Sequence, residues 1–533
     1  MMGFSVALFV PALPRVRRTH ASPTSRSGAC GDRGETDLQA HNELQKFSQS
    51  ATSVNFKPAQ DDSASVKDFP GNPIGTKRPE WTCTGKGART IGRLEERPRH
   101  RPSAVRRGGR PQRTVPGGSC RIPPMVVSSA DGPDSLTRVF DSLTPQQMRE
   151  RGSLKWSQYP GDVIGAWVAE MDLGTAPAVE RAIFGAVRDG LLGYISPSVS
   201  RAVREETARY QHETFGWRVE AEQVSLLPDV LSSLSAVIAS HTREDSPVIV
   251  PTPAYMPFLE IPGHNGRACI EVPSPRRRSQ NGLPHWELDL DGIESAMAAG
   301  AGLLVLCNPW NPVGQVLSAT QLDAVAALSS SYGVAVFADE IHAPLVLDDG
   351  LVHIPYASRP GADPDLTFTA TAASKGWNIP GLKCAQLIAS GRARTQWQSD
   401  ARTAHLEAKA SVVGALATVA ALRDGRDWLG EVCAYIRANR DMAGEALAGI
   451  EGIELTLPQA TYLSWLDCRG LGLEQPARFF RKEAGVAMSE GETFGKAWSG
   501  FCRLNLAMGR HIAQEAMHRI SNAVRRLPRT VPS

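Results

Sequence analysis

Short apolar runs, each followed by polar residues, alternate with helical stretches after residue 135 and constrain the fold of this chain more than any other feature. The runs that read as strands cover residues 248–250, 303–306, 334–337 and 366–369. Between them, Asp229 precedes a stretch with apolar residues at helical spacing, and residues 318–321 have a capping-box pattern before another. Strands that alternate with helices predict an α/β fold whose mostly parallel sheet has helices on both faces.

Side chains suited to chemistry follow the predicted strands. Tyr255 follows the first strand, Asn308 and Asn311 follow the second, Asp339 follows the third and Lys375 follows the fourth. In sheets of this kind, ligands bind beyond the carboxyl ends of the strands. We therefore expect these side chains to meet at one edge of the sheet and to form the functional site.

Taken one at a time, three of these residues have an ordinary structural explanation beside a functional one. Asn311 lies in a proline-rich turn, which either holds its amide as a hydrogen-bond donor or is only a tight turn. Asp339 is either an acid that pairs with a cation or the N-cap of a helix. Lys375 is either a surface lysine or a desolvated amine of lowered pKa that can form a Schiff base. The residues alone leave these alternatives open.

Residues 1–124 differ from the rest of the chain in charge and composition. They hold 21 Lys and Arg against 10 Asp and Glu, with 13 Gly and 13 Pro, whereas the remaining residues carry a net charge of −8. Because such a stretch buries too little apolar surface to offset its chain entropy, we predict a disordered basic extension. The arginine-rich run 93–113 raises nucleic-acid binding as an alternative, but the Pro and Gly density opposes a helix-turn-helix. We expect a solvated tail, or a stretch upstream of a start at Met125, and no nucleic-acid partner.

The apolar runs and the cysteines indicate in which cellular compartment the protein is expected. No run approaches the ~20 apolar residues of a membrane-spanning helix. The apolar residues 4–13 precede arginines instead of following them, which is the reverse of a secretory signal. The nine cysteines form no C-x-x-C motif, which argues against a zinc-ribbon or redox motif. We expect a cytoplasmic protein that has no membrane partner and no bound metal.

Eight segments resemble, in their order along the chain, the motifs of a known enzyme family. They are residues 167–172, 193–194, 251–255, 308–314, 339–342, 374–383, 461–467 and 503–506. Together they resemble the fold type I pyridoxal 5′-phosphate (PLP) enzymes, the aspartate aminotransferase superfamily of classes I and II. Within it, the chain is most similar to the cystathionine β-lyase group, the MalY/PatB-like C–S lyases.

The resemblance implies a PLP-transferase type I fold and a division of the chain. A large PLP-binding domain is expected at residues 191–410. A smaller α+β domain is expected from residues 125–190, which include the linker, together with residues 411–533. The resemblance further implies a homodimer with shared active sites, in which Tyr194 reaches the cofactor of the neighbouring subunit.

The resemblance also implies that PLP is the cofactor, and it assigns roles around the ring. Lys375 is expected to hold PLP through a Schiff base and to act as the catalytic base. Asp339 is expected to pair with the pyridine nitrogen, and Asn311 to bind the phenolic oxygen. Tyr255 and Ile341 are expected to cover the two faces of the ring.

Further residues match the family positions that bind the phosphate and the substrate. The phosphate is expected at the start of the helix near Val230 and Leu231, where free N–H groups favour an anion. Ser374 and Lys383 match positions that also hold the phosphate, although many relatives carry arginine where Lys383 stands. Arg503 matches the arginine that binds the α-carboxylate of the substrate through two parallel hydrogen bonds.

Two positions near Asp339 bear on the type of reaction. His342, also a cofactor-binding candidate, stands where aminotransferases carry a tyrosine, as expected for the C–S lyase group. Many members of that group have an acid two residues later, where this chain has Pro344. This departure affects the mouth of the pocket and leaves the particular substrate open.

Three functions are compatible with this pattern. The first is a C–S β-lyase that converts cystathionine or a related S-substituted L-cysteine to pyruvate, ammonia and a thiol. The second is an aminotransferase that passes the amino group to a 2-oxo acid. The third is a PLP-binding regulatory protein without turnover, which the presence of a residue at every catalytic position opposes. The first two differ in whether a keto-acid acceptor is required.

Overall fold

The computed structural model describes residues 134–279 and 282–528. The predicted basic extension 1–124 and the start at Met125 therefore lie outside the described residues. The predicted domain boundaries stay predictions, and the elements below are described by their own bounds.

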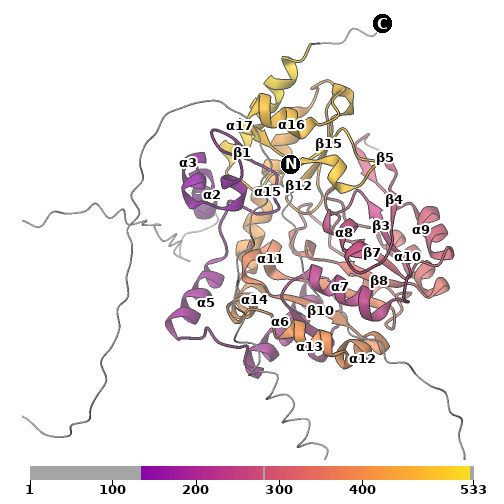
Figure 1. The fold of residues 1–533 in the computed structure, drawn as a ribbon. Helices are drawn as coiled ribbons and strands as arrows, with labels where there is room; N and C mark the ends of the chain where they lie inside the picture. Colours follow the sequence, from indigo (N-terminus) through magenta and orange to yellow (C-terminus); the bar gives the residue numbers. More distant parts are fainter. Residues whose placement is uncertain (1–133, 280–281, 529–533) are drawn as a thin grey trace, which may run out of the picture. The chain divides into compact units, whose positions relative to one another are not determined.

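A seven-stranded sheet forms the centre of the described chain (Figure 1). Its strands, in spatial order, are β2 (Val224–Leu227), β10 (Ala385–Ala389), β9 (Thr367–Thr371), β8 (Ala335–Asp339), β7 (Leu303–Cys307), β3 (Val248–Thr252) and β4 (Cys269–Pro273). Only β10 runs antiparallel to its neighbours in this sheet; the other described pairs are parallel. The four strands predicted from the sequence are β3, β7, β8 and β9, and the mostly parallel sheet confirms the predicted α/β class.

Both faces of this sheet are buried, because alternate residues of one strand enter two different cores. Along β7, Leu304 and Leu306 belong to one core and Leu303 and Val305 to the other. Helices α9 (Leu290–Ala298) and α10 (Ala319–Tyr332) contribute to the first core. Helices α7 (Val230–His241), α8 (Pro257–His264) and α12 (Gly391–Ser399) contribute to the second.

Local capping explains where the two predicted helices begin. Asp229 accepts a hydrogen bond from the backbone N–H of Ser232 and caps α7. Ser318 and Gln321 form the predicted capping box at the start of α10. The capped start of α7 fixes the direction of its first N–H groups, which matters for the site below.

A second sheet is built from the C-terminal part of the chain. Its antiparallel strands lie in the order β11 (Glu454–Thr456), β12 (Leu463–Asp467), β15 (Phe501–Asn505) and β14 (Ser489–Glu490). The hairpin β5 (Arg276–Arg278) and β6 (Pro284–Trp286) is bound to it by Arg276, which pairs with Glu454 and Asp467. The short strands β1 (Ile164–Gly165) and β13 (Val486–Ala487) pair in parallel, so N-terminal and C-terminal segments meet.

Helices from both ends of the described chain cover this second sheet. Figure 1 shows the indigo α2 (Asp134–Asp141) and α3 (Pro145–Arg151) near the yellow α17 (Arg510–Arg525). They share one core with residues of α4 (Leu154–Ser157), α15 (Arg426–Leu447) and α16 (Pro476–Phe479). Buried Lys155 forms an ion pair of 3.0 Å with Asp172 and donates to the carbonyl of Ala507, which ties the two ends together.

Three helices pack together beside the sheets: α5 (Pro177–Arg188), α6 (Pro197–Phe215) and α14 (Val412–Asp424). The short α13 (Ala401–Glu407) precedes α14. No single described helix is both long and apolar enough to cross a membrane, although α13 and α14, bent by 76° where they meet, pass that test as a pair.

Candidate functional site

Lys375 lies in the four-residue helix α11 (Ala373–Gly376), which follows β9 almost directly. Its Nζ donates a hydrogen bond of 2.8 Å to the carbonyl oxygen of Ala169. Desolvation, together with the nearby charge of Arg503, lowers the pKa of Lys375 from 10.5 to about 8, while Asp339 and Glu170 oppose this shift. The surface-lysine explanation is therefore wrong, because this amine is desolvated and faces three charged groups.

Asp339 ends β8 and is buried. One oxygen of its carboxylate accepts a hydrogen bond of 3.2 Å from the backbone N–H of Ile341. Burial raises the pKa of Asp339 to about 7, against the opposing effects of this hydrogen bond and of the charge of Lys375. Within residues 134–279 and 282–528, no cationic side chain forms an ion pair with it. A buried acid in this state favours a cationic partner, and the described residues do not supply one.

Arg503 lies on β15 of the second sheet and is buried, 3% exposed. Its guanidinium donates to the Asn311 side-chain oxygen at 3.1 Å and to the carbonyl oxygen of Trp167 at 2.7 Å. It also lies over the ring of Phe494, 4.9 Å from the centroid. No described carboxylate pairs with it, and its Nε has no partner there. Burial lowers the pKa of Arg503 to about 10, so this guanidinium is a buried cation that can accept an anionic ligand.

The turn at residues 308–314 brings Asn311 to Arg503. The Asn308 side chain accepts from the backbone N–H of Leu317, which closes the turn. Gly314 has φ 73°, and a Cβ there would lie 2.3 Å from a side-chain atom of Pro458. The turn therefore packs closely against the loop that connects β11 to β12 in the second sheet. The turn thus carries Asn311 from the end of β7 to the place where the two sheets meet.

Tyr255, Ile341 and His342 surround the same space. Tyr255 and Ile341 are half-buried and both pack against the core that holds α7 and α8. The charges of Arg503 and Asp339 both act on Tyr255, whose pKa is raised mainly by burial. His342 is buried, and burial together with the charges of Lys375 and Arg503 lowers its pKa well below 6.5. His342 is therefore neutral at physiological pH.

The predicted phosphate-binding residues lie around the start of α7. Val230 and Leu231 are its first two residues, and Ser374 lies half-buried in α11. Lys383 is exposed and donates a hydrogen bond of 3.3 Å to the capping Asp229. Asp229 caps the N-terminus of α7 and Lys383 reaches it from another segment, so an anion bound there would compete with Asp229 for Lys383.

Tyr194 stands apart from this group. It lies between α5 and α6, is 98% exposed, and has no hydrogen bond or ring contact with the other candidates among the residues described. The structure of one chain therefore brings together Lys375, Asp339, Arg503, Asn311, Tyr255, Ile341 and His342, but not Tyr194.

Sequence reasoning missed residues that the structure adds to the site. Tyr462 is buried, its ring centroid lies 6.2 Å from that of His342, and the charges of Arg503 and Glu170 act on it. Asn505 and Asn378 hold the backbone of residues 168–174. All of these except residues 173 and 174 lie inside the motif segments noted above, so the only signal for them was membership in a motif.

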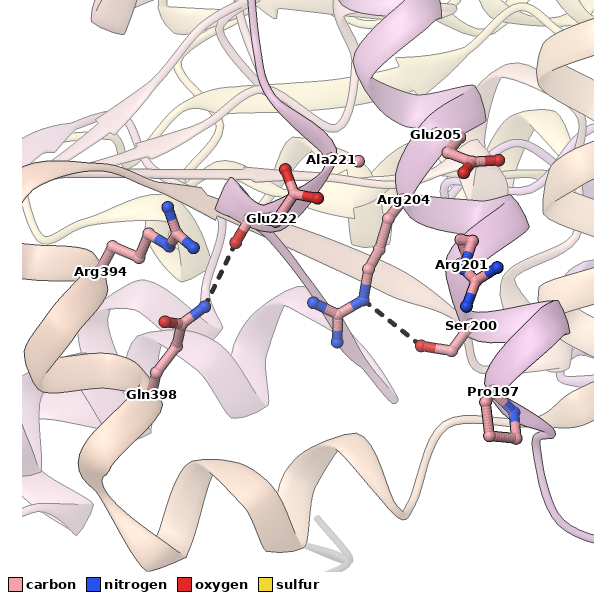
Figure 2. A pocket seen from close by; sticks show the side chains of 9 residues that line it. All are labelled: Pro197, Ser200, Arg201, Arg204, Glu205, Ala221, Glu222, Arg394 and Gln398. Carbon is pink, nitrogen blue, oxygen red and sulfur yellow. Dashed lines mark hydrogen bonds between the residues drawn. The ribbon is translucent and has the colours of Figure 1, made fainter.

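A separate surface pocket of about 410 Å³ lies along α6 and α12 (Figure 2). Its lining includes Arg201, Arg204, Glu205 and Arg394, and none of the candidate site residues. Arg204 donates to Ser200 and pairs with Glu407, so its charge is already compensated. This pocket is not part of the candidate site.

Comparison with known proteins places these features in context. Residues 156–520 match the aminotransferase class I and II family. The chain is 34% identical to the cystathionine β-lyase of Corynebacterium glutamicum over 383 residues, which cover 71% of this chain and 98% of that protein. It is 29% identical to the cystathionine β-lyase PatB of Bacillus subtilis, over 70% of this chain and 96% of that protein. The crystal structure of the PLP-bound C–S lyase from Staphylococcus hominis is similar, with a TM-score of 0.66, 25% identity, and coverage of 73% of this chain and 99% of that one.

Proposed function

The chain belongs to the aminotransferase class I and II family, and from this premise we propose that it is a PLP-dependent C–S β-lyase. Its substrate is cystathionine or a related S-substituted L-cysteine. The Cα–H and Cβ–S bonds break, the sulfur substituent leaves as a thiol, and water completes the release of pyruvate and ammonia. The observation that carries the proposal is the meeting of Lys375, Asp339 and Arg503 in one desolvated site.

The residues present fit PLP. Asp339 is a buried carboxylate without a cationic partner among the described residues, and a protonated pyridine nitrogen would supply one. Asn311 would bind the phenolic oxygen, and Tyr255 and Ile341 would cover the ring. The first turn of α7, with Ser374 and Lys383, would hold the phosphate. When bound, PLP supplies an electron sink for the electrons left at Cα after proton loss.

Lys375 is suited to hold the cofactor and to move the Cα proton. With a pKa of about 8, a fraction of its amine is already neutral near pH 7, and only the neutral amine is a nucleophile or a base. Its Nζ is held by the carbonyl oxygen of Ala169. This contact directs the amine toward the segment that borders the site and keeps it away from bulk water.

Arg503 is suited to bind the α-carboxylate of the substrate. Asn311 and Trp167 hold two of its nitrogens, which fixes the plane of the guanidinium before a ligand arrives. Orientation of the substrate by this fixed group places its Cα hydrogen beside Lys375, and such positioning contributes to the rate. His342, buried and neutral, adds no charge to the space between them.

We further propose a homodimer. Tyr194 and four apolar side chains near it on α5 and the following loop are exposed; these are Phe184 at 71%, Val187 at 57%, Leu191 at 50% and Leu192 at 60%. Apolar side chains gathered in this way are typical of a protein–protein contact, and a second copy of the chain is the expected partner.

The six described cysteines are unpaired, which supports a reducing, cytoplasmic setting.

A spectrum and a product assay test the proposed function. Purified protein is expected to absorb visible light after addition of PLP, and to lose that band on reduction with borohydride. It is expected to release pyruvate and ammonia from cystathionine when no keto acid is present. Activity that depends strictly on a keto-acid acceptor would instead identify an aminotransferase, and PLP binding without any turnover would identify a regulatory protein.

A further inference from the structure

A second buried acid, Glu340, follows Asp339 directly in the chain. Glu340 is 1% exposed, and both oxygens of its side chain have a partner. One oxygen accepts a hydrogen bond of 2.8 Å from the backbone N–H of Tyr356. The other lies 3.1 Å from Nε2 of His353, which is also 1% exposed. Because a buried acid is costly unless it is paired, this Glu340–His353 pair anchors the end of β8 to residues 353–356.

The Glu340–His353 pair reaches Asp339 through the backbone between them. The backbone N–H of Glu340 donates to the carbonyl oxygen of Ala370 on β9 at 2.8 Å. With its side chain anchored as well, the peptide group that links Glu340 to Ile341 has little freedom to turn. The N–H of that peptide group is the donor to the Asp339 carboxylate, at 3.2 Å. The direction of this carboxylate therefore depends on the anchored Glu340 side chain.

Further contacts hold the segment that carries His353. The carbonyl oxygen of Ile354 accepts a hydrogen bond of 3.3 Å from the side chain of Asn308, the first residue of the turn described above. The His353 ring packs edge-on against Phe215 at the end of α6, with the ring centroids 5.1 Å apart. Glu340 is thus attached to a segment that is itself fixed from two sides.

Resting on the proposed function, in which Asp339 pairs with the pyridine nitrogen, we propose that Glu340 and His353 are positioning residues for PLP. Their contact holds the Asp339 carboxylate ready for the ring nitrogen, and neither residue touches the cofactor itself. A partner that is fixed before binding loses less conformational freedom when the ligand arrives, and the affinity for the ligand is correspondingly higher. The pair is therefore expected to strengthen the binding of PLP before any substrate is present.

A double-mutant cycle on PLP affinity tests this role. The dissociation constant of PLP is measured by equilibrium dialysis, without substrate, for the wild type, His353→Leu, Asp339→Ala and the two changes combined. His353→Leu is expected to weaken PLP binding by about 10-fold, the size of one hydrogen bond to a charged group. In the Asp339→Ala background it is expected to have little effect, because the carboxylate that it positions is gone. An equal weakening in both backgrounds would show that His353 only supports the fold, and would overturn the proposal.

Two further variants separate positioning from a loss of stability. His353→Gln keeps an N–H donor for Glu340 and is expected to recover most of the PLP affinity that His353→Leu loses. If His353→Leu does not fold because Glu340 is left buried without its partner, Glu340→Leu combined with His353→Leu removes both polar groups and takes its place in the cycle. The same weakening of about 10-fold is expected for this pair of changes, and wild-type affinity would overturn the proposal.

A matched control makes the same substitution away from the site. His241 lies at the C-terminal end of α7, and its buried ring nitrogens have no hydrogen-bond partner within the part of the chain that the structure describes. His241→Leu therefore removes a histidine without removing such a contact, and is expected to leave the PLP dissociation constant unchanged.

Failure of the proposed function would be seen separately. Unchanged PLP affinity in Asp339→Ala would refute the assignment of Asp339 to the ring nitrogen, and the role of the pair with it. Weaker PLP binding in Asp339→Ala together with wild-type affinity in His353→Leu would overturn the role of the pair alone. Release of pyruvate enters neither measurement, so both results are independent of whether the enzyme is a lyase or an aminotransferase.

Discussion

Replacement of Arg503 by lysine is the sharpest test of how the site recognises its substrate. The structure shows a buried guanidinium held by Asn311 and the Trp167 carbonyl, with no carboxylate partner among the residues described. Lysine keeps the positive charge but loses the planar fork that can form two parallel hydrogen bonds with a carboxylate. Arg503→Ala would in addition leave the Asn311 and Trp167 oxygens without a donor, so lysine is the cleaner change.

The expected loss follows from the number of hydrogen bonds removed. A hydrogen bond to a charged group contributes about 1.5–3 kcal/mol. Loss of one such bond therefore predicts a fall in kcat/KM of about 10- to 150-fold, since each 1.36 kcal/mol is a factor of ten. Because the bond also forms in the bound ground state, much of this fall is expected in KM.

A substrate without the α-carboxylate provides the control. The kcat/KM of wild-type protein and of Arg503→Lys is measured for S-propyl-L-cysteine and for its amide, which has no carboxylate. The variant is expected to lose activity with the acid and to change little with the amide. Arg201→Lys, on the exposed part of α6, serves as a matched control variant and is expected to change neither value. An equal loss with acid and amide would refute the assignment of Arg503 to the carboxylate.

The other predictions concern the cofactor and the fold. Lys375→Ala is expected to lower the rate by about 10²- to 10⁴-fold or more through loss of the base, and to lose the borohydride-reducible absorbance; a variant with full activity would contradict the role of Lys375. In cofactor-free protein, the pKa of Asp339 is about 7 in the folded state and about 4 in the unfolded state. Between these two pH values the folded state keeps a proton that the unfolded state has released. Its contribution to stability therefore falls as pH rises from about 4 to about 7. Asp339→Asn is expected to flatten this part of the Tm–pH curve, and an unchanged slope would contradict the raised pKa of Asp339. Asp172→Ala leaves the ammonium of Lys155 buried without its partner and is expected to cost about 3–5 kcal/mol of folding free energy; in a denaturation series, Lys155→Met combined with Asp172→Leu should recover most of that loss.

Local patterns in the chain were sufficient for much of the fold. The apolar runs located β3, β7, β8 and β9, and the caps located the starts of α7 and α10. These features depend on residues close together in sequence, because a strand's burial and a helix's cap are set within a few residues. The edge strands β2 and β4 and the antiparallel β10 were not predicted, since the place of a strand in a sheet depends on packing against neighbours that are distant in sequence.

The sequence by itself determined which chemical groups follow the strands, and their order identified the family. Only the tertiary structure decided which groups surround them and how their pKa values are shifted. It joined Arg503 to the carbonyl of Trp167, 336 positions away, and it placed Glu170 where its charge acts on both Lys375 and Tyr462. It also lowered the pKa of Lys375 to about 8. The physical reason is that desolvation and charge interactions depend on what surrounds a group in space, and segments distant in sequence provide most of those surroundings.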